Sequence, residues 1–119
     1  MLIKDFNFEQ TELLSKMLYT ILFPKTSGGF DIDNHCFKGS SLELQLRLMD
    51  MIKSNKFSEA ENLLFEAIDQ DNGQDSLRVA VWFYNKLNYI DEKILNENNF
   101  SKQEVLEGIQ EIEKMVMKA

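Results

Sequence analysis

The residues best suited to chemistry lie in one short segment, Asp31-x-Asp33-x-His35-Cys36. Asp31, Asp33 and His35 occupy alternate positions, so in an extended chain their side chains would point to one side. Carboxylate oxygens and imidazole nitrogens are common metal ligands, so the three residues are candidates for a partial metal site. A solvated acidic loop is the favoured interpretation, and no bound metal is expected. The segment is not a calcium loop, because no glycine stands at the sixth position and Leu42 occupies the place of the bidentate glutamate.

His35 and Cys36 are the only histidine and the only cysteine of the chain. A nucleophilic pair needs a thiol and an imidazole that face each other, with a third group to orient the imidazole. Adjacent residues of an extended loop point in opposite directions, so these two do not form such a pair. We expect the acidic residues to lie at helix caps and on solvent-facing sides, with pKa values near their reference values. The sequence therefore predicts no catalytic residues and no enzymatic activity.

The composition makes some partners and cellular locations less expected than others. The formal net charge is −7 and the isoelectric point about 4.7, and an acidic surface repels phosphate, so nucleic-acid binding is not expected. The apolar run within residues 13–23 is too short for a bilayer and is not followed by a small-residue cleavage site. A single cysteine excludes an internal disulfide. We therefore expect a cytoplasmic protein with no membrane segment and no signal peptide.

Helical periodicity and turn residues divide the chain into elements. The predicted helices cover residues 7–23, 41–54, 59–70, 75 or 76 to 88, 91–97 and 101 to the C-terminus, and residues 24–40 form a loop. Three Ser-x-x-Glu sequences, which begin at Ser40, Ser58 and Ser101, are typical of capping boxes at helix starts. Leu42 to Leu48 alternate with polar residues as in a strand, but leucine and methionine favour helix. Residues 1–119 should then form a single helical domain whose helical core covers residues 41–119.

Two of these helices should be the most buried. Residues 41–54 are apolar on most of the circumference, which predicts a central helix. The run from Val79 to Tyr84 is apolar all round and includes Trp82, so it predicts the most buried helix, with core side chains favoured over a ligand pocket. Gly108 interrupts the last helix at a cost of about 1 kcal/mol relative to alanine. Close approach of another backbone, that of the Trp82 helix, would explain it.

Residues 42–70 combine a tight turn at Asn55, then Phe57, with Ala60, Leu64 and Ala67 in the second helix. This segment resembles a single degenerate tetratricopeptide-type helical hairpin. It departs from that repeat at Leu48, where a small residue is usual, and no second copy appears at a spacing of about 34 residues. The resemblance implies an all-α fold of antiparallel helical hairpins, packed as a small tetratricopeptide-like bundle of five to six helices.

A second resemblance covers more of the chain. It rests on an apolar first helix that ends Ile-Leu-Phe, the segment Glu61-Asn-Leu-Leu-Phe-Glu66, and Asn99-Phe100-Ser101-x-x-Glu104 followed by Gly108-Ile109. In these features the chain is similar to a family of small, uncharacterised bacterial all-helical proteins. That resemblance implies a fold and no mechanism, because no activity is assigned to the family.

The function predicted from these observations is that of a non-enzymatic helical interaction or scaffold protein. The first helix has a full apolar stripe, and the loop behind it does not specify where the stripe docks. We expect self-association as a homodimer, or capture of another helical protein, through Leu14, Met17, Ile21 and Met49. The alternative is a small-molecule or metal-binding module that uses residues 30–37. No cofactor is expected.

Overall fold

Six α-helices make up the secondary structure of the computed structural model, which describes residues 6–23, 32, 37–71 and 74–118. No β-strand occurs within those ranges, so the all-α prediction is confirmed. In chain order the helices are α1 (Phe6–Leu22), α2 (Gly39–Lys53), α3 (Phe57–Gln70), α4 (Asp75–Asn88), α5 (Glu92–Glu97) and α6 (Lys102–Met117).

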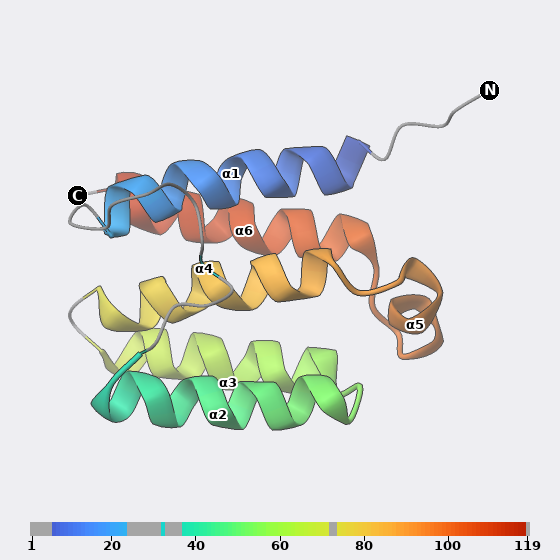
Figure 1. Ribbon diagram of the computed structural model, residues 1–119, viewed down its shortest axis with the longest axis horizontal. Helices are drawn as coiled ribbons and strands as arrows, with labels where there is room; N and C mark the ends of the chain where they lie inside the picture. The colour runs from blue at the N-terminus through green and yellow to red at the C-terminus, as the bar shows by residue number, and fades with distance from the viewer. Residues whose placement is uncertain (1–5, 24–31, 33–36, 72–73, 119) are drawn as a thin grey trace.

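Helix α4 lies in the middle of the molecule. The hairpin of α2 and α3 packs on one side of α4, and α1 and α6 pack on the other (Figure 1). Helices α1 and α6 run in the same direction, and α4 runs opposite to both (Figure 1). The short α5 turns the chain from α4 to α6. The molecule measures 42 × 28 × 26 Å along its principal axes, which is the size of a few helices packed side by side.

Burial along α4 agrees with the sequence prediction. Every residue from Val79 to Asn85 is buried, and Trp82 and Phe83 are fully enclosed core side chains. A helix that is apolar all round needs neighbours on all sides, and the two layers that flank α4 supply them. Burying an aromatic or aliphatic side chain contributes about 1.5–3 kcal/mol, so α4 provides much of the stabilisation of the fold.

The prediction that residues 41–54 form a central helix is wrong. Helix α2 lies at the edge of the molecule, and only Leu44 and Leu48 are buried in it (Figure 1). Leu42 and Leu46 are exposed. A helix that packs against a single layer buries a single stripe, so the apolar residues on the rest of its circumference remain at the surface.

Only one of the three serines of the predicted capping boxes caps a helix in the described residues. The Oγ of Ser101 accepts a hydrogen bond from the backbone N–H of Glu104 at 3.1 Å, so Ser101 caps α6. Helix α2 instead begins at Gly39, whose φ of +60° is left-handed, and Ser40 therefore lies inside the first turn. Helix α3 begins at Phe57, so Ser58 is also inside its helix and makes no cap.

Two of the turns between helices contain an asparagine with a positive φ angle. Asn55, between α2 and α3, and Asn99, between α5 and α6, both have φ of +60°. Asparagine is one of the few residues with a side chain that adopts this conformation readily. The predicted helix bounds agree with the observed ones within two residues. Most of the predicted 24–40 loop lies outside the described residues, but Ile32 and Phe37 are buried, and α2 begins before that loop was expected to end.

Candidate functional site

Helix α1 has apolar side chains on two opposite sides. Its inner side packs on α4 and α6 and buries Leu18 and Leu22. Its outer side carries Phe6, Leu13 and Ile21, which are 65%, 66% and 43% exposed. These three positions are separated by seven and eight residues, which places them on one side of a helix with about 3.6 residues per turn. We call Phe6, Leu13 and Ile21 the outer face of α1.

The four predicted partner-binding residues lie on two different helices, α1 and α2, and differ in exposure. Ile21 belongs to the outer face of α1. Met17 lies between Leu13 and Ile21 on the same side of the helix, four residues from each, and Leu14 lies beside that face, but both are partly buried against the core. Met49 is partly buried on α2, on the opposite side of the molecule (Figure 1). The four residues therefore do not form one surface. Leu13, which the sequence reasoning left out, is the most exposed apolar residue of the outer face.

Polar contacts hold α1 at both ends. Arg78 Nε donates to the carbonyl oxygen of Leu22 at 2.8 Å, and Asn88 Nδ2 donates to that of Phe8 at 3.1 Å. The buried Lys102 donates to the carbonyl oxygen of Asn88 and lies over the ring of Phe8. These contacts fix the helix in its own chain. The open question of where the inner stripe docks is thus answered within the described residues: it packs on α4 and α6.

A different candidate site lies in the groove between α3 and α6. The groove has a volume of about 340 Å³ and is lined by four glutamates, Glu61, Glu104, Glu107 and Glu111, together with Asn62, Phe65 and Gly108. The hydroxyl of Tyr84, a buried side chain of α4, donates a 2.5 Å hydrogen bond to Glu61 Oε2. The tyrosine thus reaches from the central helix to the groove.

Gly108 makes room for that tyrosine. A Cβ atom at Gly108 would lie 2.2 Å from Cε1 and 2.5 Å from Oη of Tyr84. The prediction that another backbone approaches Gly108 is therefore wrong in its detail, because the neighbour is a ring, but the Trp82 helix does supply it. The mid-helix glycine is the sequence signal for this contact, and its partner could not be read from sequence spacing.

The groove changes the acid–base properties of two side chains. Burial raises the pKa of the Glu61 carboxyl, the Tyr84 hydrogen bond opposes this, and the charges of Glu104 and Glu107 raise it further. Burial also raises the pKa of Tyr84, and the neighbouring Glu61 and then Glu111 add to the increase. The prediction that all acidic residues keep reference pKa values is wrong for Glu61, because burial raises the pKa of its carboxyl and the like charges of Glu104 and Glu107 add to the increase.

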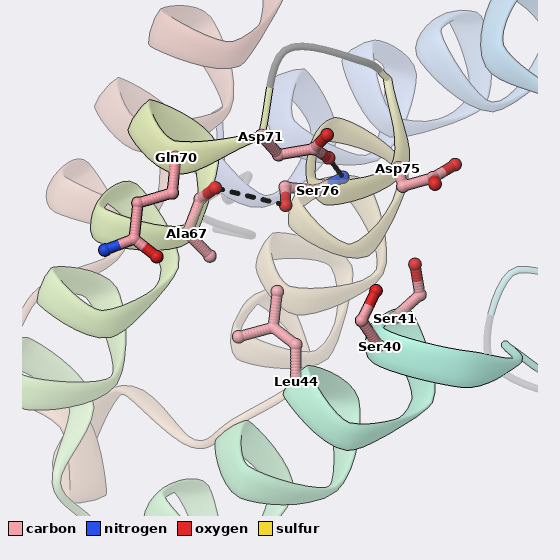
Figure 2. Close-up of a pocket in the computed structure, with 8 residues that line it drawn as sticks. All are labelled: Ser40, Ser41, Leu44, Ala67, Gln70, Asp71, Asp75 and Ser76. Atoms are coloured by element: carbon pink, nitrogen blue, oxygen red, sulfur yellow. Dashed lines mark hydrogen bonds between the residues drawn. The ribbon is translucent and has the colours of Figure 1, made fainter.

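A second hollow lies where α2, α3 and α4 meet. It has a volume of about 310 Å³, and its lining includes Ser40, Ser41 and Leu44 of α2 (Figure 2). Asp71 Oδ2 accepts a 3.0 Å hydrogen bond from the backbone N–H of Ser76 (Figure 2). A carboxylate therefore already occupies the amide end of α4 that would attract an anion. The hollow is best understood as the junction between the hairpin and α4.

The predicted metal ligands Asp31, Asp33 and His35 lie outside the described residues, as does Cys36. Across the ranges that the structure describes, no three His, Cys, Asp or Glu side chains come together in a way that could hold a metal ion. In those same ranges, no helix combines the length and the apolar character that a membrane crossing requires.

Comparison with known proteins supplies a family and no activity. Neither the curated proteins nor the solved structures include a significant match to the chain. A family model, described as "Family of unknown function (DUF6483)", matches residues 1–117. The chain therefore belongs to the family DUF6483.

Proposed function

We propose that this chain is a non-enzymatic helical interaction protein that forms a homodimer through the outer face of α1. The observation that carries the proposal is the exposure of Phe6, Leu13 and Ile21 along the whole length of a helix that is already anchored in its own chain. An apolar stripe this exposed, along a helix whose inner side is already packed, is typical of an interaction surface. The proposal includes a cytoplasmic location and a bacterial origin.

The spacing of the outer face suits pairing with a second copy. An interface between two identical surfaces must be complementary to itself. Leu13 lies seven residues after Phe6 and eight residues before Ile21. In an antiparallel pair of α1 helices, Phe6 of one copy would lie near Ile21 of the other, and the two Leu13 side chains would meet near the axis. The contact would extend over about 24 Å of helix.

Such an interface is small, since one helix from each copy provides most of it. Specific complexes usually bury about 800 Å² on each partner, and this pair is at or below that size. We therefore expect a weak dimer, with a Kd on the order of 10 µM. The four-glutamate groove is not part of this interface, because Glu61, Glu104, Glu107 and Glu111 are on α3 and α6.

Analytical ultracentrifugation tests the proposal. At a protein concentration of about 100 µM, the unmodified chain should sediment mostly as a dimer. Leu13→Glu should give a monomer, because it places two carboxylates near the axis. Leu46→Glu is the matched control: Leu46 is also well exposed, at 57%, but lies on α2 at the other side of the molecule. It should leave the dimer unchanged.

Two results would contradict the proposal. A chain that is monomeric at all concentrations would show that the outer face of α1 does not bind a second copy. A dimer that persists in Leu13→Glu and is lost in Leu46→Glu would move the interface to α2. Circular dichroism on each variant distinguishes loss of the dimer from loss of the fold.

We also propose that the α2–α3 hairpin is tetratricopeptide-like and presents a scaffold face. Phe57, Ala60 and Leu64 are buried in α3, at the positions where the sequence resembles that repeat. Small residues at such positions let two helices pack closely. This part of the proposal concerns architecture alone, and it gives the hairpin no ligand.

A further inference from the structure

The two flanks of the outer face of α1 differ in charge. Glu9 stands four residues before Leu13 and Lys16 stands three residues after it, so the two lie on the same flank of the apolar stripe. The opposite flank, three residues before and four residues after Leu13, carries the uncharged Gln10 and Met17. Lys16 is exposed and Glu9 is partly exposed, so both reach the surface beside the stripe. We call Glu9 and Lys16 the charged flank of α1.

The direction of a second α1 helix decides what the charged flank meets. In an antiparallel pair related by a twofold axis near Leu13, like flanks lie side by side, so the charged flanks of the two copies face each other. In a parallel pair, the charged flank of each copy faces the uncharged flank of the other. Only the antiparallel arrangement therefore brings Glu9 and Lys16 of the two copies within reach of each other.

The spacing of the two residues matches opposite charges in that arrangement. With a rise of about 1.5 Å per residue, Glu9 lies about 6 Å before the level of Leu13, and Lys16 lies about 4.5 Å after it. Reversal of the second helix places its Lys16 about 4.5 Å on the Glu9 side, so Glu9 and that Lys16 differ in level by about 1.5 Å. The twofold axis repeats the contact and gives two Glu9–Lys16 pairs.

Glu12, a second acidic residue near this flank, is engaged within its own chain. Its Oε2 accepts a 2.8 Å hydrogen bond from the hydroxyl of Tyr89. In a reversed second copy, the residue level with Glu12 is Leu14 and not Lys16, because the axis lies near Leu13. Glu9 is therefore the acidic residue that meets Lys16 of the second copy.

We propose that a second copy binds antiparallel to the outer face of α1, and that two Glu9–Lys16 ion pairs select this direction and this partner. The inference rests on the homodimer proposed above and adds the residues that determine its specificity. Ion pairs at the edge of an interface contribute little to affinity, but they fix the direction of binding, because a wrong pairing leaves charges unmatched or brings like charges together.

Charge reversal, measured by sedimentation equilibrium, tests the two pairs. Lys16→Glu places a carboxylate opposite each Glu9 and should raise the Kd of the dimer about tenfold. Glu9→Lys should also raise the Kd about tenfold, although it makes the net charge of −7 less negative and so weakens the general repulsion between copies. Net charge and specific pairing thus predict opposite effects of Glu9→Lys.

Two recombined samples test the antiparallel direction. The double variant Glu9→Lys/Lys16→Glu again places opposite charges together and should return the Kd to its original value. An equimolar mixture of the two single variants should form mixed dimers more tightly than either variant dimerises alone, because both pairs of the mixed dimer are again opposite. In a parallel dimer the single variants and the double variant would all bind as the unmodified chain does, which would overturn the proposal.

Arg47→Glu is the matched control for Lys16→Glu. It makes the same change of charge at an exposed residue of α2, which lies on the other side of α4 from α1 (Figure 1). It should change the Kd by less than about twofold, and circular dichroism shows whether each variant keeps its helices. Equal weakening by Arg47→Glu and Lys16→Glu would assign the effect to net charge and overturn the ion pairs.

The outcomes separate this inference from the homodimer on which it rests. A dimer that is lost in Leu13→Glu but is unaffected by reversal of Glu9 or Lys16 would overturn the ion pairs and leave the homodimer standing. A chain that is monomeric at all concentrations would overturn both proposals.

Discussion

Gly108→Ala is the substitution that most directly tests the packing around the groove. A methyl group at Gly108 would stand 2.2 Å from Cε1 of Tyr84. Non-bonded carbon atoms pack at about 3.5–4.0 Å, so the ring would have to retreat by about 1.3 Å. Tyr84 is buried and hydrogen-bonded to Glu61 at 2.5 Å, so the ring cannot retreat without disturbing that hydrogen bond.

The expected change in the free energy of unfolding combines three contributions. Overpacking in a well-packed core costs about 1–3 kcal/mol. Loss of the Tyr84 hydrogen bond to a partly exposed carboxylate costs about 1.5 kcal/mol. Alanine in place of glycine in a helix interior stabilises the helix by about 1 kcal/mol, which offsets part of these costs. We therefore expect Gly108→Ala to destabilise the fold by about 1.5–3.5 kcal/mol, although the substitution improves helix propensity.

Urea denaturation followed by circular dichroism measures this change, and a double-mutant cycle locates its cause. In a Tyr84→Leu background the obstructing ring is gone, so Gly108→Ala should there be neutral or stabilising by up to about 1 kcal/mol. Equal destabilisation in both backgrounds would show that the ring is not what excludes a side chain. A Gly108→Ala variant as stable as the original chain would refute the packing argument altogether.

Two further predictions concern the cap of α6 and the response to alkaline pH. Ser101→Ala should lower the free energy of unfolding, measured by urea denaturation, by about 1 kcal/mol. The control Ser58→Ala removes a serine that caps no helix and should change the free energy of unfolding by less than about 0.5 kcal/mol. Equal effects would contradict the assignment of the cap. Burial raises the pKa of Tyr84 above its ordinary value of 10, so the contribution of the neutral tyrosine to folding stability is present below pH 10 and is lost as the pH rises further. Tyr84→Phe should therefore reduce the fall in the free energy of unfolding above pH 10. An unchanged fall would show that other groups cause it.

Local signals in the sequence were enough to predict the helices. Asn55 and Asn99 mark turns, and the apolar run from Val79 to Tyr84 marks the buried α4, because both depend on a few neighbouring residues. The position of α2 was not predictable in the same way. Its leucines cover most of the circumference, and which of them are buried depends on which layers exist around the helix.

The groove depends on contacts between distant parts of the chain. The sequence suggests Glu61 as the acidic half of a capping box. Helix α3 begins at Phe57, two residues earlier than that box requires, and the Glu61 carboxyl accepts a hydrogen bond from Tyr84 instead. Its neighbours on α6 follow it by more than forty residues in the chain. Gly108 did signal an unusual contact, and identifying the partner required the arrangement of α4 and α6 in space.

The dependence of α1 on partners far along the chain has a consequence for how the protein is made. The carbonyl oxygen of Phe8 meets the side chain of Asn88, which is 80 residues further on. At a synthesis rate of about 5–20 residues per second, α1 waits roughly 4–16 s for its docking site. Limited proteolysis of ribosome-bound chains would test this delay. A protease should cleave within α1 in chains that end before α6 and should no longer do so in chains from which α6 has emerged. Protection of α1 in the shorter chains would contradict the delay. Throughout that interval both apolar sides of α1 are uncovered, so the nascent chain is the form of this protein in which chaperones have the most to recognise.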